Sequence, residues 1–259
     1  MKSAIEFVKK QLGDIPEIAV VLGSGLGSFA NRLNNKTTIP YEAIPNYPQT
    51  SIIGHSGQFI FGTIGGKKVL AAQGRFHYYE GHNLETIVKP IKLFHGLGIK
   101  TLIITNAAGS LDKAFPPGTI MGVNGHMDCT YRDSCEDPAM MNHAKYHDEA
   151  LLKGFKTIAN NLAIPVTIGT YCWTMGPNYE TPAEVQNCKE LGGQAVGMST
   201  VPEIQMGAEL DMSILGISLL TNYAAGISKT ELSHDEVIET ANQTEAKFVQ
   251  LLTGIIKNI

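Results

Sequence analysis

Long apolar runs are scarce in this chain of 259 residues, and their shortness excludes a membrane-spanning helix. The longest ones, around residues 18–22 and 215–220, are far shorter than the roughly 18 residues that a span requires. The chain begins Met1-Lys2-Ser3 and reaches further charged residues before any long apolar stretch, which is not the pattern of a secretory signal. We therefore expect a cytoplasmic protein that has no membrane partner.

Charged residues are also sparse. They make up 17% of the chain against a usual quarter or so, the formal net charge is -4, and no basic run occurs. A protein that holds nucleic acid by its phosphates needs clustered lysine and arginine, so we expect no nucleic-acid partner. A small anionic ligand is still compatible with this composition, because a local binding site does not need a positive total charge.

The chain has too few cysteines for disulfide bonds to stabilise a fold of this length. The four cysteines form no CxxC pair, and we expect them to be reduced thiols that fill space: Cys129, Cys135, Cys172 and Cys188. A zinc site needs three or four convergent ligands, and the chain has no HExxH or comparable pair at helical spacing. The sequence therefore predicts no metal site.

Glycine, in contrast, is abundant: 27 of the 259 residues are glycine, about one in ten, whereas the norm is roughly 7%. The cluster at 23–27 follows a buried apolar run, an order typical of a strand, a glycine turn and a helix. Such a turn presents backbone N–H groups and the hydroxyl of Ser24 to an anion, reinforced by the helix N-terminus. A dinucleotide fingerprint would need glycine where the chain has Ser28, so we do not expect NAD.

Strand and helix patterns alternate along the whole chain, without an internal repeat or a linker. Residues 58–64 and 67–72 flank Gly65-Gly66, a hairpin signal that predicts an antiparallel strand pair and argues against a purely parallel sheet. The pattern predicts one α/β layered domain over residues 1–259, with a mixed β-sheet flanked by helices. Further strands are expected at 101–105, 119–123, 165–173, 195–199 and 213–221, helices at 3–13, 84–97, 148–162, 181–191 and 201–209, a final helix capped by Ser233, and irregular segments at 40–50 and 124–147.

Polar residues gather where these strands end, which is where open α/β folds bind ligands. Residues 74–82 bracket an arginine, two histidines, two tyrosines and a glutamate with glycine; arginine suits a phosphate and histidine can shuttle a proton. Each further group has an ordinary structural explanation when it is taken alone. Their joint position favours one site that includes Gly54-His55, Tyr179-Glu180, Gly197-Met198-Ser199 and Thr221-Asn222.

These motifs resemble those of the purine nucleoside phosphorylases of the homotrimeric type. The resemblance covers nearly the whole chain except residues 124–147, and it rests on motifs in the family's order: 23–27, 54–55, 74–81, 105–109, 176–181, 195–203 and 221–222. It implies a strongly twisted mixed sheet flanked by helices, a homotrimer with active sites near subunit contacts, inorganic phosphate as a substrate, and no metal or organic cofactor.

The resemblance also implies a role for individual residues. The phosphate site would contain Ser24, His55, Arg75, His77, the backbone N–H of Ala107, and Ser199. The ribose would contact Tyr79, Met198 and His234, and the purine would contact Tyr179, Glu180 and Asn222. His77, Glu180 and Asn222 would be the catalytic residues. Glu80 would contact His77 and support it without touching the substrate.

The implied activity is phosphorolysis of 6-oxopurine nucleosides, which are inosine, guanosine and their deoxy forms, to the free base and ribose 1-phosphate. A purine nucleoside hydrolase and a catalytically silent purine-binding protein stay as alternatives. Two departures from the family pattern stand out. Tyr223 replaces a lysine of many relatives, which leaves the preference among inosine, guanosine and xanthosine open. Where the family places an aromatic that reaches a neighbour's ribose site, this chain has Asp137, with Tyr131 or Tyr146 as substitutes.

Overall fold

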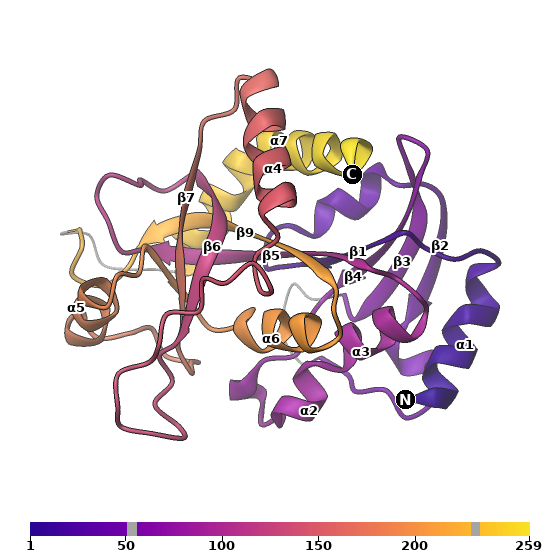
Figure 1. The fold of residues 1–259 in the computed structure, drawn as a ribbon, viewed down its shortest axis with the longest axis horizontal. Coiled ribbons are helices and arrows are strands. Elements are labelled where there is room, and N and C mark those ends of the chain that lie inside the picture. Colours follow the sequence, from indigo (N-terminus) through magenta and orange to yellow (C-terminus); the bar gives the residue numbers. More distant parts are fainter. Residues whose placement is uncertain (51–55, 229–233) are drawn as a thin grey trace.

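A mixed sheet organises the chain in the computed structural model, which describes residues 1–50, 56–228 and 234–259, the side chains of 234–238 excepted (Figure 1). In these ranges the sheet has nine strands in the order β2-β3-β4-β1-β5-β8-β7-β6-β9, and an additional pairing joins β5 to β9. The strands are β1 (Ile18–Leu22), β2 (Asn34–Pro40), β3 (Gln58–Ile64), β4 (Lys67–Gln73), β5 (Thr101–Ser110), β6 (Thr119–Asp128), β7 (Val166–Trp173), β8 (Ala195–Gly197) and β9 (Ser213–Tyr223).

The pairing of β5 with β9 closes a ring of strands that runs β5-β8-β7-β6-β9 and returns to β5. From β5 the sheet continues through β1, β4, β3 and β2 as an open extension. The predicted mixed sheet is confirmed, because β3 and β4 form the expected antiparallel hairpin while β1 runs parallel to both β4 and β5. Closing the ring was not predicted; it leaves fewer unpaired strand edges than an open sheet would.

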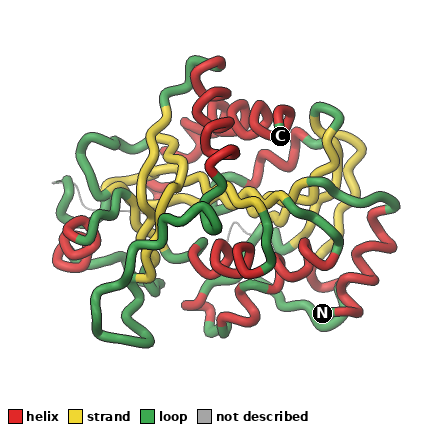
Figure 2. The backbone as a smooth tube through the Cα atoms, in the orientation of Figure 1, coloured by secondary structure: helices red, strands yellow, loops and turns green. Residues whose placement is uncertain are grey.

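Helices cover both faces of the sheet (Figures 1 and 2). One face carries α1 (Lys2–Leu12), α2 (Leu84–Ile87), α3 (Lys89–Gly96) and α6 (Val201–Glu209), and the other carries α4 (Glu149–Asn161) and α7 (His234–Asn258). The remaining helix, α5 (Pro182–Glu190), lies beside the ring. None of the helices in the described ranges combines the length and the apolar character that crossing a bilayer needs.

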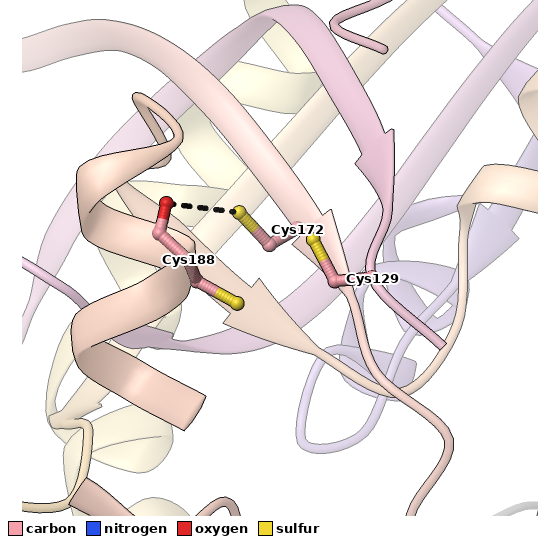
Figure 3. A group of neighbouring side chains, drawn as sticks. All are labelled: Cys129, Cys172 and Cys188. Atoms are coloured by element: carbon pink, nitrogen blue, oxygen red, sulfur yellow. Dashed lines mark hydrogen bonds between the residues drawn. The ribbon is translucent and has the colours of Figure 1, made fainter. Parts of the chain in front are cut away.

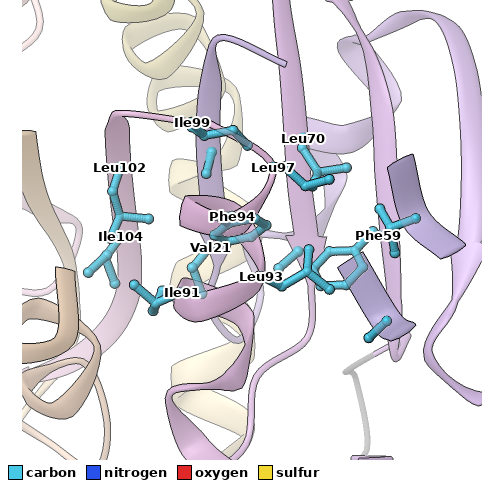
Figure 4. Packing of buried hydrophobic residues seen from close by; sticks show 14 of the residues in the cluster. Val21, Phe59, Leu70, Ile91, Leu93, Phe94, Leu97, Ile99, Leu102 and Ile104 are labelled. Carbon is cyan, nitrogen blue, oxygen red and sulfur yellow. The ribbon is translucent and has the colours of Figure 1, made fainter. Parts of the chain in front are cut away.

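The core between α3 and the sheet shows why this layering is stable. Leu93 and Phe94 of α3 are fully buried among Val21, Leu70 and Phe59 from three neighbouring strands (Figure 4). Burying a side chain of this size contributes about 1.5–3 kcal/mol. The same hydrophobic cluster includes side chains of both β1 and β5, which pair side by side. This packing positions the ends of the two strands, and both ends carry predicted site residues.

Most predicted elements are present, but several boundaries were wrong for local reasons. The helix expected after the glycine turn is a short 3-10 helix, η1 (Gly27–Arg32). The segment expected to be irregular at 40–50 includes the end of the edge strand β2 and the 3-10 turn η2 (Tyr41–Ala43). The helix expected at 84–97 is divided between α2 and α3, because Pro90 has no N–H to continue it.

Other boundaries concern strand lengths and helix caps. Strands β5 and β6 run to Ser110 and Asp128, beyond the predicted ends, so part of the irregular segment 124–147 belongs to the sheet. The capping box of Thr181 and Glu184 is confirmed, whereas α1 begins at Lys2 without a side-chain cap. The predicted cap Ser233 lies outside the described residues.

Two buried histidines, His126 on β6 and His147 before α4, contact each other in the interior. Nδ1 of His126 lies 3.0 Å from Nε2 of His147, and both side chains are almost fully buried. Burial, aided by the neighbouring His147, lowers the pKa of His126 to about 3, and burial lowers the pKa of His147 to about 4. Both rings are therefore neutral in the folded protein at neutral pH.

We expect the folded protein to lose stability as the pH falls below the ordinary histidine value of about 6.5. In the unfolded chain His126 and His147 bind protons near their ordinary pKa, whereas in the folded chain they bind protons only at about pH 3 to 4. The unfolded state therefore binds more protons in mild acid, and acid favours unfolding. Between pH 7 and pH 5 we expect each ring to lower the free energy of unfolding by about 1–2 kcal/mol. Urea denaturation at the two pH values measures this decrease. His126→Gln should flatten this dependence by about one proton, and the exposed His143→Gln should leave it unchanged. Equal slopes for all three proteins would contradict the assignment.

Candidate active site

One cavity of about 250 Å³ lies where the C-terminal halves of β5 and β9 meet the end of β8. Strand β8 runs antiparallel to β5. Its C-terminal end therefore points back toward the middle of β5 and not toward the sheet edge where β5 and β9 end. Every predicted site residue whose side chain the structure describes lines this cavity: Ser24, Arg75, His77, Tyr79, Ala107, Tyr179, Glu180, Met198, Ser199 and Asn222. His55 and the side chain of His234 lie outside the described residues.

Arg75 lines the cavity and contacts Ser199 and Glu203. Its Nη1 donates to Ser199 Oγ at 3.0 Å, and its Nη2 lies 3.1 Å from Glu203 Oε2. The arginine and glutamate side chains are only 2% and 1% exposed, so the ion pair is buried. Glu203 was not predicted as a site residue, although it belongs to the motif at 195–203. It is a positioning residue, because it fixes the guanidinium in the cavity wall.

Ser199 is aimed by a strained turn. Thr200 has φ 79° and ψ -48°, and the N–H of Val201 donates to the carbonyl of Ser199 at 2.9 Å, which defines a γ-turn. Asn106 holds the strained residue, because its Nδ2 donates to Thr200 Oγ1 at 3.0 Å. A backbone of this kind persists only where its surroundings enforce it. The turn places Ser199 next to Arg75 directly before α6.

The glycine turn after β1 brings Ser24 against β5. A Cβ at Gly23 would lie 2.7 Å from the Cα of Asn106, so only glycine permits this approach. The N–H of Gly23 donates to Thr105 Oγ1 at 3.1 Å, and that hydroxyl donates to the carbonyl of Val21 at 2.9 Å. Thr105 thus ties the two strands together, and Ser24 lines the same cavity wall as Ala107.

His77 carries a carboxylate partner and a stacked ring. Its Nδ1 lies 3.1 Å from Glu80 Oε1, so the contact predicted between these residues is present. The ring of Tyr79 stacks on the imidazole at 4.7 Å. Burial lowers the pKa of His77 despite the nearby carboxylate. A neutral imidazole that donates its Nδ1 proton to Glu80 presents Nε2 as a hydrogen-bond acceptor.

Glu180 and Asn222 also line the cavity, and each accepts a hydrogen bond from a threonine hydroxyl. The hydroxyl of Thr174 donates to Glu180 Oε1 at 2.5 Å, and burial raises the pKa of Glu180. The hydroxyl of Thr221 donates to Asn222 Oδ1 at 2.9 Å, which orients the amide. Sequence reasoning missed Thr174 and placed Thr221 in the site without a role, since a hydroxyl that orients another side chain leaves no motif. A Cβ at Gly109 would lie 3.3 Å from Asn222 Nδ2, so glycine leaves room for the amide.

Met198 and Tyr79 close around the backbone of Gly176. A Cβ at Gly176 would lie 2.6 Å from Met198 Sδ and 2.7 Å from Tyr79 Cδ1, and the residue has φ 70°. Glycine is therefore required on both steric and conformational grounds. Two of the three predicted ribose residues, Met198 and Tyr79, therefore both lie against Gly176 in the cavity wall.

Comparison with known proteins assigns the chain to a family. The model of the phosphorylase superfamily matches residues 17–257. The chain belongs to this superfamily. The purine nucleoside phosphorylase 1 of Geobacillus stearothermophilus is 38% identical over all of this chain and 97% of its own length. Crystal structures of the Schistosoma mansoni purine nucleoside phosphorylase in complex with inosine and with adenosine each match with a TM-score of 0.90 and 33% identity, over 100% of this chain and 95% and 96% of theirs. The predicted resemblance is confirmed.

The two predicted departures from the family pattern concern Tyr223 and the segment that follows β6. Tyr223 does not line the cavity, and its hydroxyl donates to the carbonyl of Lys113 at 3.4 Å. Tyr146 packs against His126 inside the protein, whereas Tyr131 is 39% exposed and accepts a hydrogen bond from Asn187 at 2.7 Å. Of the two predicted substitutes, Tyr131 is therefore the one that stands at the surface.

Proposed function

We propose that this chain catalyses the phosphorolysis of 6-oxopurine nucleosides, with ribose 1-phosphate and the free base as products. The observation that carries the proposal is one cavity whose lining combines a buried arginine and two serines with a carboxylate and an amide. We assign the arginine and the serines to the phosphate end, the carboxylate and the amide to the purine end, and Met198 and Tyr79 to the ribose between them. The relatives named purine nucleoside phosphorylase support the same reaction.

The arginine end suits the attacking phosphate. Phosphorolysis breaks the bond between ribose C1′ and purine N9 through a transition state with positive charge on the sugar, so phosphate must be held beneath C1′. Arg75 supplies charge-assisted hydrogen bonds, and Ser24, Ser199 and the N–H of Ala107 supply neutral ones. We assign His55 to the same group. The Nε2 atom of neutral His77 accepts a hydrogen bond from the P–OH group of a singly protonated phosphate, which keeps the anion oriented.

The amide end suits the departing base, which gains negative charge as the bond breaks. Asn222 interacts with N7 and O6 of the purine, and one preorganised donor of this kind is typically worth about 3 kcal/mol of barrier. Glu180 accepts the N1–H of a 6-oxopurine, and Tyr179 lies beside the ring. Adenine has no hydrogen on N1, so the carboxylate would face a lone pair. His234 donates to the ribose 5′-hydroxyl.

We further propose that the chain forms a single domain over residues 1–259, acts as a homotrimer in the cytoplasm, and uses no cofactor besides its substrate phosphate. Tyr131 is the side chain that we assign to the neighbouring subunit's ribose site, because it is exposed and anchored by Asn187. Sedimentation of the purified chain tests the trimer.

A substrate panel tests the reaction class and the base specificity together. We expect inosine and guanosine to be cleaved only when phosphate is present, and adenosine to have a kcat/KM at least 100-fold lower. Turnover must be measured rather than binding, because the Schistosoma mansoni relative has been crystallised with adenosine. Xanthosine completes the panel, since Tyr223 leaves the preference among oxopurines open.

The same panel discriminates between the alternatives. Equal cleavage in phosphate-free buffer would indicate a nucleoside hydrolase. Hypoxanthine binding in calorimetry without any turnover would indicate a silent purine-binding protein. The buried pair of Arg75 and Glu203 argues against the latter, because a protein that binds only the base has no use for a desolvated arginine at the far end of the cavity.

A further inference from the structure

Three of the four cysteines, which were predicted to be unrelated space-filling thiols, converge on one point beside the active site (Figure 3). Cys172 lies on β7, Cys129 directly follows β6, and Cys188 lies in the last turn of α5. Their sulfur atoms all lie within 4.8 Å of one another. The strand register explains part of this, because Cys172 pairs with Met127 and Cys129 follows two residues later on the same face.

The surroundings of the cluster favour a soft metal ion over any other ligand. The three cysteines are 7%, 0% and 2% exposed, and apolar side chains such as Leu111, Val185 and Val196 surround them. A Cβ at Gly193 would overlap Cys172 Sγ, so the fold leaves space for this sulfur. Thiolates select thiophilic ions, and an apolar shell limits the access of solvent to such a site.

The distances come close to those of a metal site. A tetrahedral Zn²⁺ with sulfur ligands at about 2.3 Å places the sulfurs about 3.8 Å apart. Moving the three thiols into this geometry requires shifts of about 1 Å or less. A second cavity, lined by Cys129, Cys188, Glu180 and Glu184 among others, gives the ion a path and leaves room for water as the fourth ligand.

We propose that Cys129, Cys172 and Cys188 form a binding site for a thiophilic divalent cation of the Zn²⁺ class, and that its occupancy inhibits the enzyme. Each coordinating thiol releases its proton to solvent, and no electron is transferred. The site is separate from the substrate cavity, which none of the three cysteines lines.

The coupling to activity follows from the order of the chain. Cys172 and Cys188 stand on either side of the loop 174–181, which carries Tyr179 and Glu180 and begins with Thr174, the donor to Glu180. An ion that draws α5 toward β7 therefore displaces the ends of the loop that holds the base. Misplacing such a group by about 1 Å can cost about 100-fold in rate. This coupling rests on the proposed function, whereas the metal site itself does not.

Titration of the reduced, metal-free chain with Cd²⁺ tests the site directly. We expect a thiolate-to-cadmium charge-transfer absorption that reaches its plateau at one ion per chain. Cys188→Ala and, separately, Cys129→Ala should reduce this absorption at least five-fold, with circular dichroism confirming that each variant is folded. The matched control is Cys135→Ser, which removes the exposed cysteine outside the cluster and should change nothing.

Absence of the absorption, or its persistence in both alanine variants, would overturn the site. For the coupling, one equivalent of Zn²⁺ should lower kcat/KM for inosine at least ten-fold, with the KM for phosphate changed less than two-fold and with full recovery on chelation. Stoichiometric binding without this loss refutes the inhibition, and a chain that binds Cd²⁺ but turns over no nucleoside refutes only the proposed function.

Discussion

Asn222→Asp is expected to lower kcat/KM for inosine by two to three orders of magnitude while improving the relative turnover of adenosine. The amide is 5% exposed and is oriented by the hydroxyl of Thr221, so its donor is preorganised for the purine. A carboxylate at this position repels the O6 atom of an oxopurine but accepts a hydrogen bond from the 6-amino group of adenine. Loss of one preorganised donor typically costs about 3 kcal/mol of barrier. Steady-state kinetics with both nucleosides at saturating phosphate measures the effect.

The neighbouring Tyr223→Phe provides a matched control. This substitution removes only a hydroxyl that donates to the carbonyl of Lys113, outside the cavity, so the preference for inosine over adenosine should stay as it is. An unchanged preference in Asn222→Asp would show that Asn222 does not contact the base. A comparable shift in Tyr223→Phe would instead show that the preference for inosine depends on the whole end of β9 and not on Asn222 alone.

The site could be predicted from the sequence to the extent that its residues follow strands and belong to short motifs. Ser24, Arg75, Ser199 and Asn222 each follow or end a strand, and the fold brings all four to one cavity. Glycine marked the same places because close backbone approach leaves a compositional trace, as at Gly23 against Asn106. Periodicity similarly predicted the buried strands, whose side chains face apolar neighbours on both faces.

What the sequence could not show depends on contacts between distant segments. Glu203 lies 128 positions from Arg75 in the chain, yet the two form one buried ion pair whose partner no local pattern names. The pairing of β5 with β9 closes the ring through residues about 110 positions apart. The convergence of Cys129, Cys172 and Cys188 has the same origin, because each spacing alone is uninformative. The register of β6 with β7 brings Cys129 near Cys172, and the packing of α5 adds Cys188.

Arg75→Ala is expected to raise the KM for phosphate by at least two orders of magnitude while changing the KM for inosine far less. The guanidinium is the buried positive charge of the phosphate end, and hydrogen bonds to an ionised partner contribute about 1.5–3 kcal/mol each. The variant should also be destabilised by about 3–5 kcal/mol, because Glu203 is left as an uncompensated buried carboxylate. Phosphate dependence of the initial rate and urea denaturation measure the two effects separately.

The double variant Arg75→Met/Glu203→Leu separates binding from stability. Replacing both members of a buried ion pair by apolar residues of similar volume is often neutral or stabilising, so the unfolding free energy should return to the wild-type value or exceed it. The KM for phosphate should stay as high as in Arg75→Ala, because no cation is restored. If phosphate affinity recovered together with stability, the arginine would only support the fold and the phosphate would bind elsewhere. If Glu203→Gln alone raised the KM for phosphate while leaving that for inosine, the carboxylate would be confirmed as the group that orients Arg75 toward the anion.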